Sequence, residues 1–344
     1  WRPRGGRAAR LLNGLLTAFI LASHAFLPVC VALKLYVDPP EELEQITLCS
    51  LVTSICMGFL FKAALFVAQG ETLRQTVRLL ADIRAQFGDR QQNHSTRRRY
   101  RRLSDSVYRR YQMVAVPAVI GWVLCPMLSR SVRGSDQAPQ VAQRQLPVPV
   151  WFPVDVYASP TYEFLYVAHS FCALVAAESS VCVDIFFIHM MLMVAAELDV
   201  LNDNLTVMED VNLYATPNER RGLTSVNGST GRQSAIHDSS QSTLGENAAR
   251  EGIHEQLSKN VQHHQAILRS VSLLQSAMNV SIFSLLFFNM ANLCSSLFVA
   301  AVLVQRDGNV GKALNALTSI PALLYETRMY CIYGHIMTEQ RARC

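Results

Sequence analysis

The feature that most constrains this chain is a series of long apolar stretches without a charged residue. No Asp, Glu, Lys or Arg occurs in 11–33, 45–61, 111–129 or 270–305. About 20 apolar residues are enough for a helix to cross a bilayer, whereas a helix on a soluble core normally keeps a charged face. Only 17% of the residues are charged, against about 25% in ordinary soluble domains. The sequence therefore predicts a membrane protein and not a large soluble helical core.

These stretches predict an all-α, polytopic membrane helical bundle with six spans. The spans are 11–36, 46–69, 111–129, 164–196, 270–305 and 313–337, which makes residues 1–344 one transmembrane domain. The first stretch is not a removable signal peptide, because no cleavage site followed by a soluble domain comes after it. We expect Glu326 and Arg328, near the end of the last span, to reach headgroups or water by snorkelling.

The charges between the spans predict the orientation of the chain. Residues 74–110 contain eleven arginines and three acidic residues, whereas the loop 37–45 has four acidic residues and no basic one. Positive loops stay in the cytoplasm, so we predict a cytoplasmic N-terminus and a basic cytoplasmic loop at 70–110 that faces an anionic leaflet. A nucleic-acid-binding arm would need a free tail or a soluble fold, and this loop lies between two spans. No single partner is predicted for any of its arginines.

Two cytoplasmic segments are predicted to be amphipathic helices. In 71–88, a stripe of apolar residues indicates that the second helix continues beyond the membrane until Gly88 stops it. The residues of this stripe are Leu73, Val77, Leu80, Ile83 and Phe87. A similar pattern occurs at 255–269. The cytoplasmic loop 197–269 also contains an insertion, 215–252, which is rich in small polar residues, lacks aromatic residues, and is predicted to be flexible.

Four further motifs carry a resemblance to a known family. They are "LPVPVWFPVDVYASPTYEFLYVAHSFCAL" (146–174), "ELDVLNDNL" (197–205), "VQHHQAILRSVSLLQSAMN" (261–279) and "YCIYGHIMTEQ" (330–340). With them, the chain resembles the insect odorant receptors. The entry into the fourth helix resembles that of a variable, odorant-tuning subunit and not that of the coreceptor. The predicted cytoplasmic N-terminus agrees with this family.

The resemblance implies an olfactory receptor in the plasma membrane of sensory neurons. Such a receptor binds a small volatile odorant in the outer half of its helix bundle. It pairs with the coreceptor subunit in a heterotetramer and gates a non-selective cation channel, with no enzyme step and no nucleic acid involved. The cytoplasmic amphipathic helices suit the anchor through which subunits meet. The resemblance also implies a seventh, pore-lining helix, and the sequence is interpreted as truncated before it.

Other interpretations remain open. A gustatory receptor of the same superfamily would lack the helix-four entry motif. A transporter would show internal repeats, and none is visible. A G-protein-coupled receptor of ordinary topology would have its N-terminus outside. A non-functional truncated form is the last alternative.

The resemblance and the predicted orientation select candidate ligand-binding residues. A volatile ligand needs an apolar pocket with a few aromatic and polar groups, and these should lie in the outer halves of the spans. The candidates are Val52, Ile55, Gly121, Trp122, Cys125, Tyr162, Tyr166, His169, Asn292 and Ser296. Helix packing, interfacial anchoring and, for His169, a hydrogen bond to a neighbouring helix are the competing roles.

The sequence predicts no catalytic residue, metal site or cofactor. It has no zinc-type cysteine pair, nucleophile–base pair or phosphate loop. His263 and His264 are adjacent and point about 100° apart on a helix, which makes them a poor metal pair. We expect them to be solvated or to face the subunit anchor.

The predicted orientation can be tested through glycosylation. Acceptor triplets at Asn93, Asn204 and Asn227 lie in segments predicted to be cytoplasmic, so we expect none of them to carry sugar. Mass spectrometry of peptides from protein expressed in insect cells checks this. Sugar on Asn93 or Asn204 would reverse the orientation.

Overall fold

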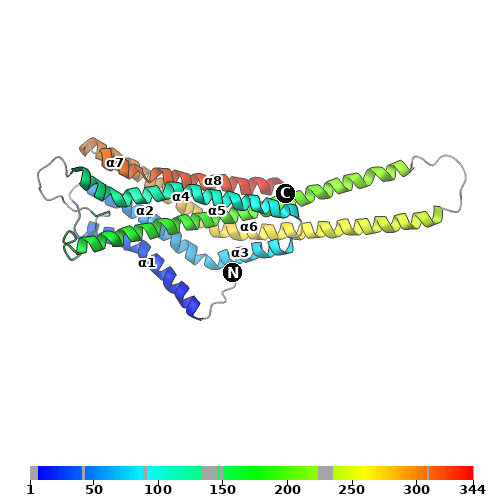
Figure 1. The fold of residues 1–344 in the computed structure, drawn as a ribbon, viewed down its shortest axis with the longest axis horizontal. Helices are drawn as coiled ribbons and strands as arrows, with labels where there is room; N and C mark the ends of the chain where they lie inside the picture. Colours follow the sequence, from blue (N-terminus) through cyan, green and yellow to red (C-terminus); the bar gives the residue numbers. More distant parts are fainter. Residues whose placement is uncertain are drawn as a thin grey trace. The chain divides into compact units, whose positions relative to one another are not determined.

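The computed structural model describes residues 7–40, 43–87, 91–133, 146–147, 150–223, 235–307 and 310–343. Within these ranges the chain forms helices joined by turns and loops, and no strand. The helices are α1 (Arg7–Val37), α2 (Leu43–Ala68), α3 (Gly70–Gln86), α4 (Gln91–Arg133), α5 (Thr161–Leu223), α6 (Ala235–Asp307), α7 (Val310–Leu317) and α8 (Ile320–Arg343) (Figure 1). The predicted all-α fold is confirmed.

The described helices have the length and the surface of membrane helices. Four segments are long and apolar enough to cross a bilayer, namely Arg7–Val37, Gln45–Ala68, Thr161–Met208 and His254–Gln305. Large apolar side chains are at least 51% exposed on their surfaces, for example Leu11 and Phe19 on α1 and Phe283 and Phe287 on α6. Exposure of such side chains is favourable in lipid and unfavourable in water. The predicted crossings at 111–129 and 313–337 lie within α4 and across α7 and α8, and as crossings they stay predictions.

Two helix breaks differ from the sequence-based expectation. The second helix does not run on to Phe87, because α2 ends at Ala68 and α3 begins at Gly70. Glycine weakens a helix by its backbone freedom, which makes a break here inexpensive. The segment 313–337 is interrupted between α7 and α8, shortly before Pro321. Proline has no N–H with which to continue α7, but it fits the first turn of α8.

The helices belong to two compact units, whose division falls inside α3, α4, α5, α6 and α8. The first unit comprises Trp1–Glu71, Ser104–His189 and Ser276–Ile332. One of its apolar cores, here called the α1–α2 cluster, consists of Leu27, Cys30, Val31, Cys49, Val52, Cys56 and Val150. A second core, the α6–α7 cluster, consists of Leu51, Val299, Ala300, Leu303, Ala313 and Ala316. Phe66 of α2 also meets Phe186 and Phe187 of α5 edge to face.

The second unit comprises Thr72–Leu103, Met190–Gln275 and Tyr333–Cys344. The predicted stripe of α3 is largely confirmed, since Leu73, Leu80 and Ile83 are buried, although Thr76 is buried in place of Val77. In α5, every residue in 194–198 is buried. A helix that is buried on every side is a core helix, so this part of α5 forms the centre of the unit.

The predicted flexible insertion, 215–252, lies partly outside the described residues, at 224–234. Its described ends are helical, since α5 continues to Leu223 and α6 begins at Ala235. Good helix formers such as Ala248, Ala249 and Arg250 favour this extension of α6.

The buried stripe of α3 generates a stability prediction. Leu80 is fully buried, so Leu80→Ala removes packed atoms and leaves a cavity. We expect it to reduce the free energy of unfolding by about 2–5 kcal/mol. Leu257→Ala is the control, because Leu257 is 45% exposed in the same unit. Thermal unfolding of the purified protein in detergent compares the two, and equal effects would contradict the burial of this stripe.

Candidate functional site

Three charged side chains meet inside the first unit. Lys62 of α2, Asp184 of α5 and Glu326 of α8, here called the buried charge cluster, have side chains that are 12%, 0% and 7% exposed. The Lys62 ammonium group lies 3.0 Å from both carboxylate oxygens of Asp184. It also donates to Oε1 of Glu326. A buried charge is very costly without a partner, so these contacts hold the three helices together.

Further polar groups complete the hydrogen bonding of this cluster. The hydroxyl groups of Tyr111 and Tyr330 donate to Asp184 over 3.2 and 3.0 Å. The Asn289 side chain donates to Oε2 of Glu326 over 3.3 Å, and Lys62 donates to the Ser180 hydroxyl over 2.9 Å. Tyr111 lies on α4 and Asn289 on α6. The cluster therefore connects α2, α4, α5, α6 and α8.

The sequence-based expectation for Glu326 is wrong. This side chain does not reach headgroups or water, because it is buried against Lys62. Lys62 is not among the residues predicted from the sequence to form a site, although it lies inside the predicted span 46–69. Charged residues inside membrane spans usually face the interior of a bundle and pair with one another, and that rule is the signal that could have found the cluster.

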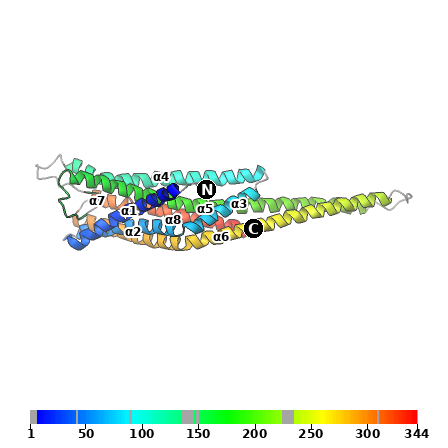
Figure 2. The same ribbon diagram turned by 90° about the horizontal axis from the view of Figure 1, so that it is seen from below.

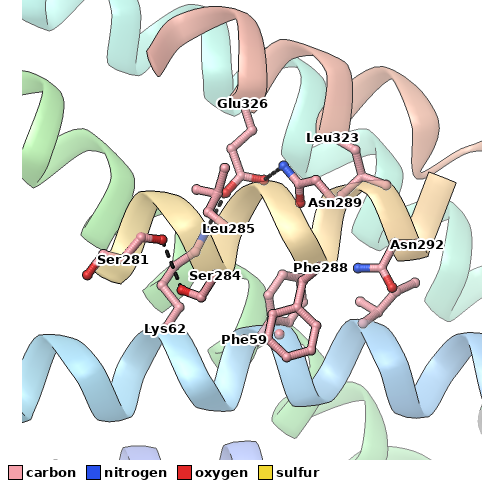
Figure 3. A pocket seen from close by; sticks show the side chains of 12 residues that line it. Phe59, Lys62, Ser281, Ser284, Leu285, Phe288, Asn289, Asn292, Leu323 and Glu326 are labelled. Carbon is pink, nitrogen blue, oxygen red and sulfur yellow. Dashed lines mark hydrogen bonds and ion pairs between the residues drawn. The ribbon is translucent and has the colours of Figure 1, made fainter. Parts of the chain in front are cut away.

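A pocket adjoins the buried charge cluster between α2, α6 and α8 (Figure 3). Its cavity volume is only ≈ 20 Å³, which is enough for about one water molecule, so a larger ligand enters only if side chains such as Phe288 move. Its apolar wall consists of Ile55, Gly58, Phe59, Leu285, Phe288 and Leu323, and its polar wall of Lys62, Ser281, Ser284, Asn289, Asn292 and Glu326. A small apolar site with a few polar groups is what a small organic ligand requires.

Two features of this pocket bear on ligand binding. Asn292 is only 3% exposed, and its Oδ1 has no hydrogen-bond partner among the residues that the structure describes. An unsatisfied buried acceptor costs about 1–3 kcal/mol, and a ligand with a donor group would relieve that cost. At Gly58, a Cβ atom would lie 3.3 Å from Phe288, which is tighter than an ordinary contact, so a larger residue here requires this ring to shift by a few tenths of an ångström.

The structure divides the predicted ligand-binding residues into groups. Ile55 and Asn292 line the pocket. Ser296 is fully buried, and its hydroxyl lies 3.5 Å from that of Ser319. Val52 belongs to the α1–α2 cluster, against which Trp122 packs.

The predicted residues of α5, which are Tyr162, Tyr166 and His169, lie close to the group formed by Val52 and Trp122. Tyr166 donates its hydroxyl to the carbonyl of Val123 over 2.5 Å, and its ring lies 5.9 Å from that of Tyr162. His169 is fully buried with its ring 5.7 Å from Phe26, which packs against the α1–α2 cluster. Neither ring nitrogen of His169 has a hydrogen-bond partner, so the alternative role of a bond to a neighbouring helix is not observed.

Two predicted residues stand apart. A Cβ atom at Gly121 would meet nothing within 4 Å. Cys125 lies in α4, and its side chain is outside the described residues. Gly121 is not among the residues that line the pocket.

The second unit contains a separate ion cluster. Glu197 is fully buried, and it accepts hydrogen bonds from Arg84 at 2.9 Å and from Arg97 at 2.7 and 3.0 Å. His263 lies 3.7 Å from Glu197 and stacks on Phe87, with ring centroids 4.3 Å apart. Two expectations are corrected here. Two arginines of the basic segment have a specific partner, and His263 is a core residue and not a solvated one.

No group of three or more possible metal ligands occurs in the described part of the chain. Both clusters consist of ion pairs and hydrogen bonds between helices. Their chemistry is therefore that of structural and binding sites.

The comparisons with known proteins agree with this architecture. The model of the 7tm odorant receptor family matches residues 42–343. The insect olfactory receptor OR5 from Machilis hrabei has a similar fold, with a TM-score of 0.66 at 13% identity, and its complex with eugenol has a TM-score of 0.69 at 14% identity. Each comparison covers 98% of this chain and 75% of the other. Such low identity shows the fold alone. No curated protein matches the sequence.

The buried charge cluster generates a stability prediction. Lys62→Met leaves the carboxylates of Asp184 and Glu326 without their shared ammonium group, and we expect a loss of about 3–5 kcal/mol. Lys34→Met is the matched control, because Lys34 and Asp38 form an ion pair that is 21% and 59% exposed, and such pairs contribute about 0–1 kcal/mol. Thermal unfolding in detergent measures both. A Lys62→Met variant no less stable than Lys34→Met would contradict the role of the cluster.

Proposed function

This chain belongs to the 7tm odorant receptor family, and we propose that it binds a small volatile ligand in the pocket between α2, α6 and α8 and thereby gates a cation channel. The family is one of receptors and not of enzymes. The protein is a multi-pass membrane protein, and we place it in the plasma membrane of olfactory sensory neurons. As a tuning subunit it would form a heterotetramer with the coreceptor of the family.

The observation that carries this proposal is the unpartnered Oδ1 of Asn292 in an otherwise mainly apolar pocket. A volatile ligand offers little polar surface, so most of its binding energy comes from apolar contacts, such as those of Ile55 and Phe288. One hydrogen bond to Asn292 would fix its orientation. This favours alcohols, phenols and other ligands with a donor over hydrocarbons of the same shape.

Eugenol is a suitable first probe, since it is a small phenol and is bound in the structure of the Machilis hrabei receptor OR5. At 14% identity the ligand preferences of the two proteins need not agree. The panel therefore also contains hydrocarbons, esters and alcohols of similar size.

Three other predicted residues, Val52, Trp122 and His169, support a second apolar region in the first unit. Val52, Trp122 and Phe26 form or cover the α1–α2 cluster. His169 lies against it with two unpartnered ring nitrogens. We propose that a ligand or a water molecule satisfies His169 when the receptor is occupied.

The position of the pocket suggests how binding acts on the helices. Lys62 and Glu326 line the pocket and also belong to the buried charge cluster. A ligand that contacts them binds better to one arrangement of α2 and α8 than to another. Such a difference in affinity is sufficient to shift the population of conformations, and therefore to open a channel.

Binding and current test the proposal together. We expect a member of the panel to stabilise the purified chain against heat and to evoke current when the chain is co-expressed with the coreceptor. Gly58→Ala pushes the Phe288 ring by its added methyl group, which meets that side chain at 3.3 Å. We expect it to weaken binding by about tenfold or more.

Gly14→Ala is the control, since its methyl group would meet no atom within 4 Å. The proposed pocket is refuted if Gly58→Ala binds every active ligand as tightly as Gly14→Ala does. The receptor function is refuted if no member of the panel binds and none evokes current.

A further inference from the structure

A basic hollow lies on one face of α4 in the second unit. It is lined by His94, Ser95, Arg98, Arg99 and Arg102. Residues four apart lie on the same side of a helix, so His94, Arg98 and Arg102 form one row, and Ser95 and Arg99 form the row beside it. The hollow begins within the first turns of α4, which starts at Gln91.

The arginines of this hollow differ from their neighbours in their partners. Arg84 and Arg97 are held by the buried carboxylate of Glu197. Arg98, Arg99 and Arg102 are exposed, and among the described residues no ion pair to a carboxylate is formed by any of them. Three guanidinium groups of like charge therefore stand close together in water, where they repel one another unless an anion lies between them.

The inner side of the same helix is fixed. Arg97 makes two hydrogen bonds to Glu197, and Tyr100 is buried. These contacts set the rotation of α4 about its axis. The outer row of arginines is consequently presented in one direction and does not depend on a mobile loop.

We propose that this hollow binds a soluble polyphosphate. Guanidinium groups donate paired hydrogen bonds to phosphate oxygens in a fixed geometry, and two adjacent rows of donors match a chain or ring that bears several phosphates. His94 and the hydroxyl of Ser95 add polar groups at one end. The site is separate from the ligand pocket, which involves other residues.

The lining decides between a polyphosphate and other anions. All five lining residues are polar or charged, whereas a site for an anionic lipid combines basic groups with apolar surface that enters the membrane. A single-stranded nucleic acid would need aromatic side chains on which bases stack, and none lines the hollow. A soluble, multiply phosphorylated ligand remains the best match.

Equilibrium binding to the full chain in detergent tests this proposal. The probes are inositol hexakisphosphate, inorganic phosphate, and vesicles of neutral lipid with or without phosphatidylserine. We expect the hexakisphosphate to bind, and to weaken as salt is added. Substitution of Arg98, Arg99 and Arg102 together by Gln should reduce this binding by about tenfold or more.

The matched control replaces Arg109, Arg110 and Arg328 by Gln, which are also exposed and change the net charge by the same amount. We expect it to lose less than about threefold, because it alters only the distant field. Arg98, Arg99 and Arg102 changed together to Lys keep the charge and should bind with intermediate strength. Equal losses in both Gln variants, no binding by the unmodified chain, or binding only to phosphatidylserine vesicles would overturn the proposal. An unchanged thermal midpoint shows that each variant is folded.

Discussion

The fold of the first unit depends on the ion pairs of Lys62 with Asp184 and Glu326. In hydrocarbon, apolar side chains gain little by leaving lipid for protein, so helices associate through packing and polar contacts. A charged Lys62 in that environment must keep its partners, because separation would leave a bare charge in a medium of low dielectric constant. Tyr111 and Asn289 extend the same contacts to α4 and α6. Within the first unit, five helices therefore contribute side chains to one hydrogen-bonded network around this ammonium group.

The proposed ligand pocket shares residues with the buried charge cluster. Glu326 is shared between the two, and Asn289 contacts both Glu326 and Thr327. This combination suits a receptor. The hydrogen-bonded network of the cluster fixes the arrangement of the helices, and the Oδ1 of Asn292 in the adjoining pocket supplies an unused hydrogen-bond acceptor. Gly58 contributes by letting α2 lie close to Phe288. The pocket is small because α2 and α6 approach each other there.

The sequence locates the helices along the chain better than it predicts which side of each helix faces the interior. Apolar stretches locate the helices, and the predicted topology places Val52, Ile55 and Asn292 at comparable depth. A span that is apolar all round has no periodicity to show which side faces the interior, so Val52 and Ile55 could not be assigned in advance to different apolar regions. Lys62 and Glu326 are 264 residues apart, and their pairing depends on which sides of their helices face the interior. Gly58 carried a usable signal, because small residues mark close contacts between membrane helices.

The basic segment 74–110 shows that the total charge of a segment does not reveal what each of its arginines contacts. The positive-inside rule counts the arginines of 74–110 as equivalent charges. In the second unit they are not equivalent, since Arg84 and Arg97 neutralise Glu197, whose exposed fraction is 0%. Without them that carboxylate would be buried alone, and α5 could not keep it in the core. Arg98, one residue further along α4, is exposed and does not pair with Glu197. The same stretch is therefore predicted to set the topology through its total charge, and it serves the fold through Arg84 and Arg97. Arg98, Arg99 and Arg102 are exposed, and they are the arginines proposed to meet an external anion.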